Sequence, residues 1–118
     1  MNALRNKVQL IGHLAANPEV KTLDGGKTIA KFAMATNETY KNQKGEKVQE
    51  TQWHNVVAWD KTAELMGQLL AKGKEVMIEG KLTSRSYDDK EGNKRYITEV
   101  VAQEFLLLGA KQTADLPF

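Results

Sequence analysis

The chain has 118 residues and a formal net charge of only +2, from 17 Lys and Arg against 15 Asp and Glu, and it contains no cysteine. The length predicts one domain with a modest core, and the missing cysteines exclude disulfides, thiolate metal ligands and a cysteine nucleophile. Because no 18-residue apolar stretch occurs and residues 1–7 lack the apolar segment of a secretory signal, we expect a cytoplasmic protein.

The first half of the chain alternates apolar and polar residues, which is typical of strands. Strands are predicted at 7–14 and 29–37, with a hairpin-type turn of sequence DGGK at 24–27 before the second. Within residues 40–50, the segment 41–47 is polar, includes three lysines, and is predicted to form a loop. A third strand is predicted at 51–59.

The period changes at 62–72, where apolar residues recur every three or four positions, which predicts one amphipathic helix. Asp60 is predicted as its N-cap, and Gly73 follows its last turn. The residues expected on its buried side are Ala63, Met66, Leu69 and Leu70.

Alternation returns at 75–87, and a polar turn at 88–94 leads to a strand at 95–102, which 105–108 extend. The inner positions expected in the first of these strands are Val76, Ile78, Gly80 and Leu82. Three strands, a helix and two strands is the element order of an OB-fold. We therefore predict an all-β fold, a five-stranded Greek-key barrel with one helix between strands 3 and 4, in residues 1–110, followed by a short tail at 111–118.

Four aromatic residues lie among polar and basic neighbours in these strands or at their edges. Trp53 and Trp59 are six apart, so alternation places both on one outward face, and Tyr87 shares a face with Lys81 and Arg85. Aromatic rings beside cations are what an unpaired nucleic-acid strand requires, because every base can stack and every nucleotide carries a phosphate. The predicted stacking residues are Tyr40, Trp53, Trp59 and Tyr87.

The cations near these rings are predicted to neutralise phosphates. Arg85 is the strongest single candidate, because it lies two residues from Tyr87 on the same strand face. The predicted phosphate-binding set is Lys41, Lys44, Lys47, Lys81, Arg85, Lys94 and Arg95. The alternative interpretation is that the rings belong to the core or to a protein interface and that the cations are only solvated surface.

Nothing in the sequence indicates catalysis. His13 and His54 are the only histidines, they are 41 residues apart, and no carboxylate spacing supports a metal site or a catalytic pair. No Gly-rich phosphate loop is present. The sequence therefore predicts a binding protein that is not an enzyme and has no metal or cofactor.

These residues together resemble the bacterial single-stranded DNA-binding proteins of the homotetrameric type. The resemblance covers nearly all of residues 6–108 and the last four residues. It is carried by VQLIG at 8–12, PE at 18–19, WHNVV at 53–57, IEGKL at 78–82 with Arg85 and Tyr87, YITEVV at 96–101 and DLPF at 115–118. Tyr40 and Tyr87 stand where tryptophan is usual in this family, and Trp59 where phenylalanine is usual.

The resemblance implies sequence-independent binding and protection of single-stranded DNA in replication, recombination and repair, by a nucleoid-associated homotetramer. It also implies that Lys7 and His54 lie near subunit interfaces. Partner proteins would dock on the terminal tip, Asp115, Leu116, Pro117 and Phe118, whose apolar residues are out of place on a polar tail. Family tips usually carry several acidic residues on a long linker, whereas this tip has one aspartate on a short tether.

Two other interpretations stay open from the sequence. An OB-fold primosome-accessory or protein-interaction subunit would use the aromatic residues as a protein interface and bind nucleic acid weakly. An RNA-binding OB module is the other, because nothing in the residues discriminates the 2′-hydroxyl group.

Overall fold

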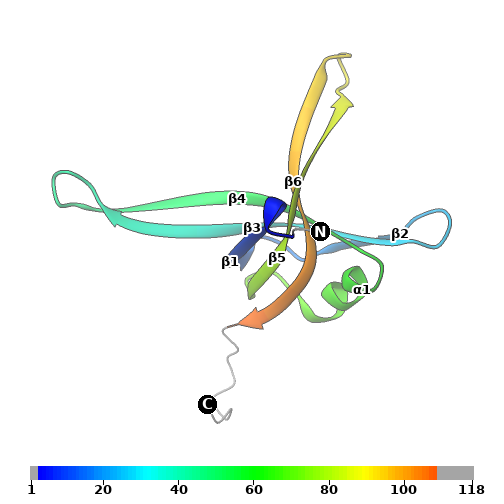
Figure 1. Cartoon of the computed structure of the whole chain (residues 1–118), viewed down its shortest axis with the longest axis horizontal. Helices are drawn as coiled ribbons and strands as arrows, with labels where there is room; N and C mark the ends of the chain where they lie inside the picture. Colours follow the sequence, from blue (N-terminus) through cyan, green and yellow to red (C-terminus); the bar gives the residue numbers. More distant parts are fainter. Residues whose placement is uncertain (1–2, 109–118) are drawn as a thin grey trace, which may run out of the picture.

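The computed structural model describes residues 3–108, which form one barrel with two long projecting hairpins (Figure 1). The elements in chain order are the 3-10 turn η1 (Ala3–Asn6), β1 (Val8–Leu14), β2 (Glu19–Thr22), β3 (Thr28–Lys41), β4 (Lys47–Trp59), α1 (Asp60–Leu69), β5 (Glu75–Asp88) and β6 (Lys94–Leu108). The strand order is β1-β5-β6-β4-β3-β2, and β1 also pairs with β3, which closes the barrel. The predicted five-stranded barrel with one helix after its third strand is confirmed, and the short strand β2 adds an unpredicted pairing partner for β3.

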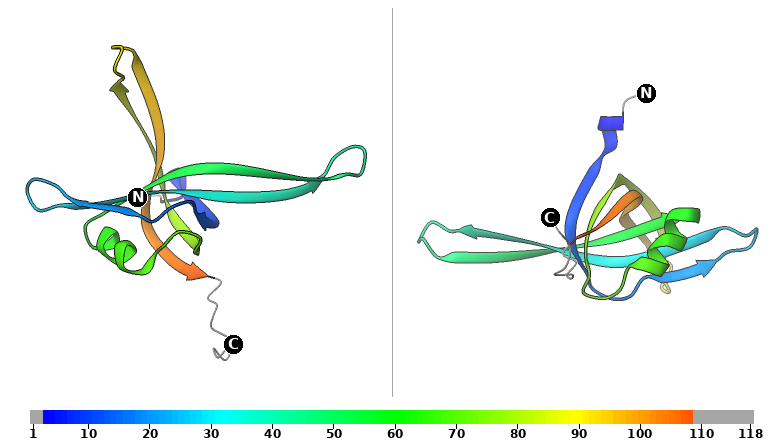
Figure 2. Two further views of the ribbon diagram at one scale, coloured as in Figure 1. Left: turned by 180° about the vertical axis from the view of Figure 1, so that it is seen from behind. Right: turned by 90° about the horizontal axis from the view of Figure 1, so that it is seen from below.

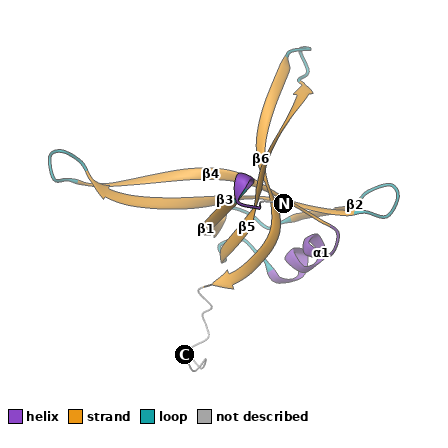
Figure 3. Cartoon of the chain, viewed as in Figure 1, coloured by secondary structure: helices purple, strands orange, loops and turns teal. Residues whose placement is uncertain are grey.

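Alternation along the strands produces the core. The even-numbered residues of β1, β3 and β5 within the barrel point inward, as predicted, and α1 lies against one end of the barrel (Figures 2 and 3). The largest fully buried side chains are Met34, Met66, Ile78, Val56 and Val76. Burial of these side chains is the main favourable term for a chain without disulfides.

Two glycines allow the strands to approach closely enough for closure. A Cβ atom at Gly12 would overlap the carbonyl oxygen of Ala35 where β1 meets β3. A Cβ atom at Gly80 would overlap the carbonyl oxygen of Val101, at the point where the register between β5 and β6 shifts. Glycine at such positions permits a close approach of two backbones.

Both long hairpins continue beyond the barrel as two-stranded ribbons. Pairing between β3 and β4 runs out to Lys41↔Lys47, and pairing between β5 and β6 runs out to Asp88↔Lys94. The predicted loop at 41–47 is confirmed at 42–46, where the side-chain oxygen of Asn42 accepts hydrogen bonds from two backbone N–H groups of the turn. The strands on either side are longer than the predicted 29–37 and 51–59.

The predictions for three residues at the ends of elements are also wrong. Leu82 is 47% exposed, because β5 has left the barrel at that point and continues in the hairpin. Leu69 is 47% exposed, because α1 ends there and Leu70, in an extended conformation, takes the buried position instead. Asp60 is not the N-cap: the N-cap is Trp59, no side-chain hydrogen bond caps the helix, and Asp60 has a positive φ of 54°.

Candidate nucleic-acid interface

Trp53 and Trp59 lie on the outer face of β4, as the alternation predicts. Trp53 is 65% exposed and Trp59 is 40% exposed. The residue directly opposite Trp53 on β3 is Ala35, which is too small to cover an indole, whereas Trp59 lies opposite the larger Ile29. Both rings therefore present a face to solvent, Trp53 more fully than Trp59.

A groove lies on this outer face, at the point where the two hairpins separate. β4 and β6 pair there in parallel over only two positions, Val56↔Val100 and Val57↔Val101. Two hollows of about 450 and 350 Å³ adjoin at this junction, and both are lined by Lys31, Val57, Arg85 and Glu99. Because they share these residues, we treat them as one feature, the central groove. Trp59 lines the first hollow and Asn55 the second.

The Arg85 side chain projects into the central groove and is held by Glu99. Nε of Arg85 donates to Oε1 of Glu99 at 3.0 Å, and Nη2 donates to Oε2 at 3.4 Å. The hydrogen bond that Arg85 donates to Glu99, and then the negative charge of Glu99, raise the pKa of the guanidinium above its usual value. Glu99 is only 8% exposed, so the floor of the groove carries an ion pair with a nearly buried acidic partner.

The two predicted tyrosines are placed differently from each other. Tyr87 is 46% exposed and lies on the outer face of the β5–β6 hairpin, two residues beyond Arg85. Tyr40 pairs with Val48, five residues from Trp53 on β4, so it lies on the opposite face of the β3–β4 hairpin. The charge of Glu50 raises the pKa of the Tyr40 phenol, and burial and a hydrogen bond to Glu50 add to the effect. The structure therefore does not bring Tyr40 onto the face that carries the tryptophans.

Most of the predicted phosphate-binding cations are exposed and lie along the hairpins. Lys41 and Lys47 are directly opposite each other at the end of the β3–β4 hairpin, with Lys44 in the turn between them. Lys81 shares the face of Arg85, and Lys94 lies at the end of the other hairpin. None of these five lysines forms a salt bridge within residues 3–108.

Arg95 lies directly opposite Tyr87 and is paired with a carboxylate in the hairpin turn. Its Nε donates to Oδ2 of Asp89 at 3.0 Å. This hydrogen bond, with the one from the backbone of Asn93, lowers the pKa of the Asp89 carboxyl. Arg95 therefore also helps to fix the turn.

Lys7 and His54, the two predicted interface residues, lie in different parts of the fold. Nζ of Lys7 lies 3.4 Å from Oε2 of Glu79 on the outer face of β1 and β5. His54 is half-buried, with Nε2 2.9 Å from the Thr36 hydroxyl, on the face of β4 opposite to Trp53. The tip, residues 115–118, lies outside the described residues.

Three residues near the candidate site were missed by the sequence analysis. Lys31 alternates outward in its predicted strand, and this signal was sufficient to include it among the cations. Tyr96 is 73% exposed on the β5–β6 hairpin, and its polar neighbours gave the same signal as those of Tyr87, but it pairs with Ser86 and so lies on the face opposite to Tyr87. Glu99 gave no signal, because its partner Arg85 is 14 residues away and meets it only through the strand register.

Residues 3–108 contain neither a metal site nor a membrane-spanning helix. No group of three or more His, Asp or Glu side chains there is arranged to hold a metal ion. The helix α1 has ten residues, and no helix in this part of the chain meets the length and hydropathy of a membrane span. The exposed rings and the central groove are therefore the features on which a functional assignment depends.

A closed barrel with one helix and exposed aromatic rings along its outer face places the chain in the OB-fold class. Proteins of this class bind oligonucleotides or oligosaccharides. Comparison with known proteins narrows the class: residues 5–108 match the family described as the Single-strand binding protein family. The chain belongs to this family, and the predicted resemblance is confirmed.

Relatives and solved structures agree with this assignment. The chain is 45% identical over 109 residues to single-stranded DNA-binding protein 1 of Chlorobaculum tepidum, covering 92% of this chain and 67% of the relative. It is 44% identical over 108 residues to single-stranded DNA-binding protein 1 of Xylella fastidiosa, covering 91% and 79%. The Plasmodium falciparum SSB in its complex with ssDNA superimposes with a TM-score of 0.79 at 31% identity, over 87% of this chain and 94% of that chain.

Proposed function

We propose that this chain binds single-stranded DNA independently of sequence, by stacking bases on exposed rings and neutralising phosphates with the cations around them. Membership of the single-strand binding protein family makes it a single-stranded DNA-binding protein. The observation that carries the mechanism is the exposure of Trp53 and Trp59 on one outer face that leads into the central groove. Stacking tolerates any sequence because every base has a π-face.

The two hairpins determine the path of the bound DNA strand. Trp53 and Trp59 provide the first stacking surface and Tyr87 the second, on either side of the central groove. Tyr40 extends the surface around the edge of the β3–β4 hairpin to its other face. The phosphates follow the exposed cations Lys41, Lys44, Lys47, Lys81, Lys94 and Arg95. Binding is the whole activity we propose, without a catalytic step, metal or cofactor.

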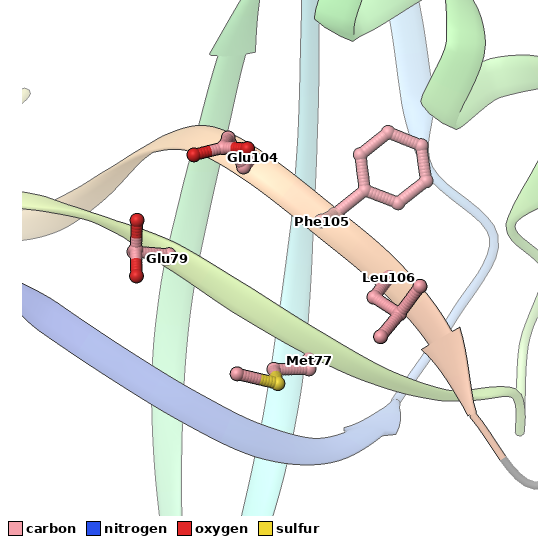
Figure 4. A pocket seen from close by; sticks show the side chains of 5 residues that line it. All are labelled: Met77, Glu79, Glu104, Phe105 and Leu106. Carbon is pink, nitrogen blue, oxygen red and sulfur yellow. The ribbon is translucent and has the colours of Figure 1, made fainter.

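We further assign the chain to a homotetramer. Ile11, Met77 and Leu106 are directly opposite one another across β1, β5 and β6, and Ile11 and Leu106 are 51% and 59% exposed. Figure 4 shows Met77 and Leu106 side by side on this face, with the carboxylates of Glu79 and Glu104 next to them. An exposed apolar row bordered by polar groups is the kind of surface that a second copy covers.

The oligomer assignment is tested by placing a charge in this row. Leu106→Glu should reduce the oligomer in analytical ultracentrifugation, because the interface would bury an uncompensated carboxylate. Gln103→Glu is the matched control, since it adds the same charge at an exposed position of the same strand. An oligomer equally stable in both variants contradicts the assignment.

The cellular role follows from this binding activity. We propose that the protein coats and protects single strands exposed during replication, recombination and repair, and that it acts in the cytoplasm with the nucleoid. We propose that Asp115, Leu116, Pro117 and Phe118 dock replication and repair proteins. Deleting residues 115–118 should leave oligo-dT affinity unchanged and abolish recovery of partner proteins, and unchanged recovery would reject the docking role.

The test of the central proposal uses the two intrinsic tryptophans. Titration with poly-dT at low salt should quench their fluorescence strongly, and added salt should reverse the quenching, since stacking and phosphate contacts act together. Poly-U in competition measures preference for DNA over RNA, and duplex DNA measures preference for unpaired strands. Absence of quenching by poly-dT in the folded protein would refute the proposal and favour a protein-interaction subunit.

A further inference from the structure

The ion pair on the floor of the central groove is an unfavourable neighbour for a phosphate. Glu99 already neutralises Arg85, and a phosphate in contact with the guanidinium would lie close to a carboxylate that is 92% buried. Two like charges at short range in a poorly solvated site repel each other strongly. The exposed lysines of the hairpins offer phosphates an unopposed charge instead.

The pair keeps unused hydrogen-bonding capacity. A guanidinium has five N–H donors, of which Arg85 uses two on Glu99, and its side chain is 53% exposed. A carboxylate has about four acceptor positions, and within residues 3–108 only the two bonds from Arg85 occupy those of Glu99. The groove floor therefore offers donors and acceptors side by side.

The walls of the first hollow fit an aromatic heterocycle better than an ion. Ile29, Val57 and Val101 line it together with the ring of Trp59, and the small polar residues Thr83 and Ser84 complete the wall on β5. The three aliphatic side chains and the indole ring provide apolar surface for a flat ring and no positive charge for a phosphate. Lys31 lies at the same hollow and supplies the charge that a nucleotide's own phosphate would meet.

We propose that the central groove binds one nucleobase by its edge, with Glu99 accepting a hydrogen bond from a base N–H and Arg85 donating to a base carbonyl or ring nitrogen. This inference rests on the proposed function and reassigns Arg85 from phosphate to base. Each of the four bases presents at least one N–H donor and one acceptor on its pairing edge, so the subsite accepts all of them. That edge is occupied in a duplex, so the subsite selects unpaired strands.

The test compares oligo-dT with an oligonucleotide of the same length made of N3-methylthymidine. The methyl group removes the N–H that Glu99 would accept, while the phosphates and stacking faces are kept. Affinity for the unaltered protein should fall about tenfold, the usual effect of losing one hydrogen bond to a charged acceptor. In Glu99→Gln the loss of affinity caused by the methyl group should be smaller. An equally large loss in that variant would show that the methyl group disturbs another contact and would overturn the assignment.

A second measurement separates base from phosphate contact at Arg85. Arg85→Gln should weaken oligo-dT binding and leave the slope of log K against log[salt] unchanged, whereas a lost phosphate contact makes it shallower by about 0.7. A shallower slope in Arg85→Gln overturns the proposal. If the unaltered protein bound both oligonucleotides equally, only the base subsite would fail, whereas failure to bind oligo-dT at all would refute the proposed function.

Discussion

Replacing Trp53 by alanine separates binding from folding more cleanly than any other change on this surface. Trp53 is 65% exposed and faces only Ala35 across the β3–β4 hairpin, outside the buried core cluster. Trp59 is a poorer choice, because 60% of it is covered and it lies at the start of α1. Its removal would change stability and binding together.

The expected magnitudes follow from that exposure. About a third of a ring that buries at most roughly 250 Å² is covered, so its loss costs no more than about 2 kcal/mol of folding free energy at ~25 cal/mol per Å². One stacked base contributes about 1–3 kcal/mol to binding, which corresponds to roughly 5- to 150-fold in Kd. Trp53→Ala should therefore stay folded and bind oligo-dT at least about fivefold more weakly.

The assay is fluorescence anisotropy of labelled oligo-dT, with urea unfolding of each variant measured in parallel. Trp53→Phe keeps a stackable ring and should retain most of the affinity, whereas Trp53→Leu keeps apolar area without a π-face and should behave like Trp53→Ala. If Trp53→Leu bound as tightly as Trp53→Phe, or if the folded fraction of Trp53→Ala bound normally, the stacking mechanism at this ring would be wrong.

Three further predictions follow from the fold and its charges. Lys47→Gln should make the slope of log K against log[salt] shallower by about 0.7, measured by titrating oligo-dT at several salt concentrations. Gly12→Ala should lower the free energy of unfolding by about 1–3 kcal/mol in urea, because the added methyl overlaps the carbonyl of Ala35, and an unchanged midpoint would contradict this. The pKa of Asp89 is lowered by Arg95 from 3.8, so its contribution to the hairpin turn is complete above that value and is lost as pH falls below it. The rate of amide hydrogen exchange in the turn, divided by the rate in Asp89→Asn, should therefore rise as pH drops through this range. The variant lacks the titrating carboxyl and should show no change of its own there.

Patterns within a single strand correctly predicted which side chains face outward and which face the core. Strand alternation placed Trp53 and Trp59 outward, because a period of two determines the face of every residue once one face is buried. The same rule identified the inner residues Met34 and Ile78. It failed at Leu82, where the strand continues but the barrel does not, because alternation does not show where the element that covers a face ends.

Features that depend on the pairing between strands could not be predicted from the sequence. Glu99 meets Arg85 only because β5 and β6 pair in a register that includes a shift near Gly80. The opposite placement of Tyr40 follows from its pairing with Val48, and the predicted strands at 29–37 and 51–59 were too short to include this pairing. Cation and ring positions could be listed from the sequence, but which of them share a groove required the junction of two hairpins.

The parallel contact between β4 and β6, only two residue pairs long, has a mechanical consequence. On the side of Val56 and Val100 that leads to the hairpin tips, β4 and β6 no longer pair, and the outer part of each ribbon is held by its own two strands alone. The two arms can therefore bend apart or together without disturbing the barrel. Purines and pyrimidines differ in width, and an opening with independently hinged sides accommodates either one. The ability of this chain to bind DNA of any sequence would then come from the flexibility of the two hairpins as much as from the chemistry of its aromatic rings.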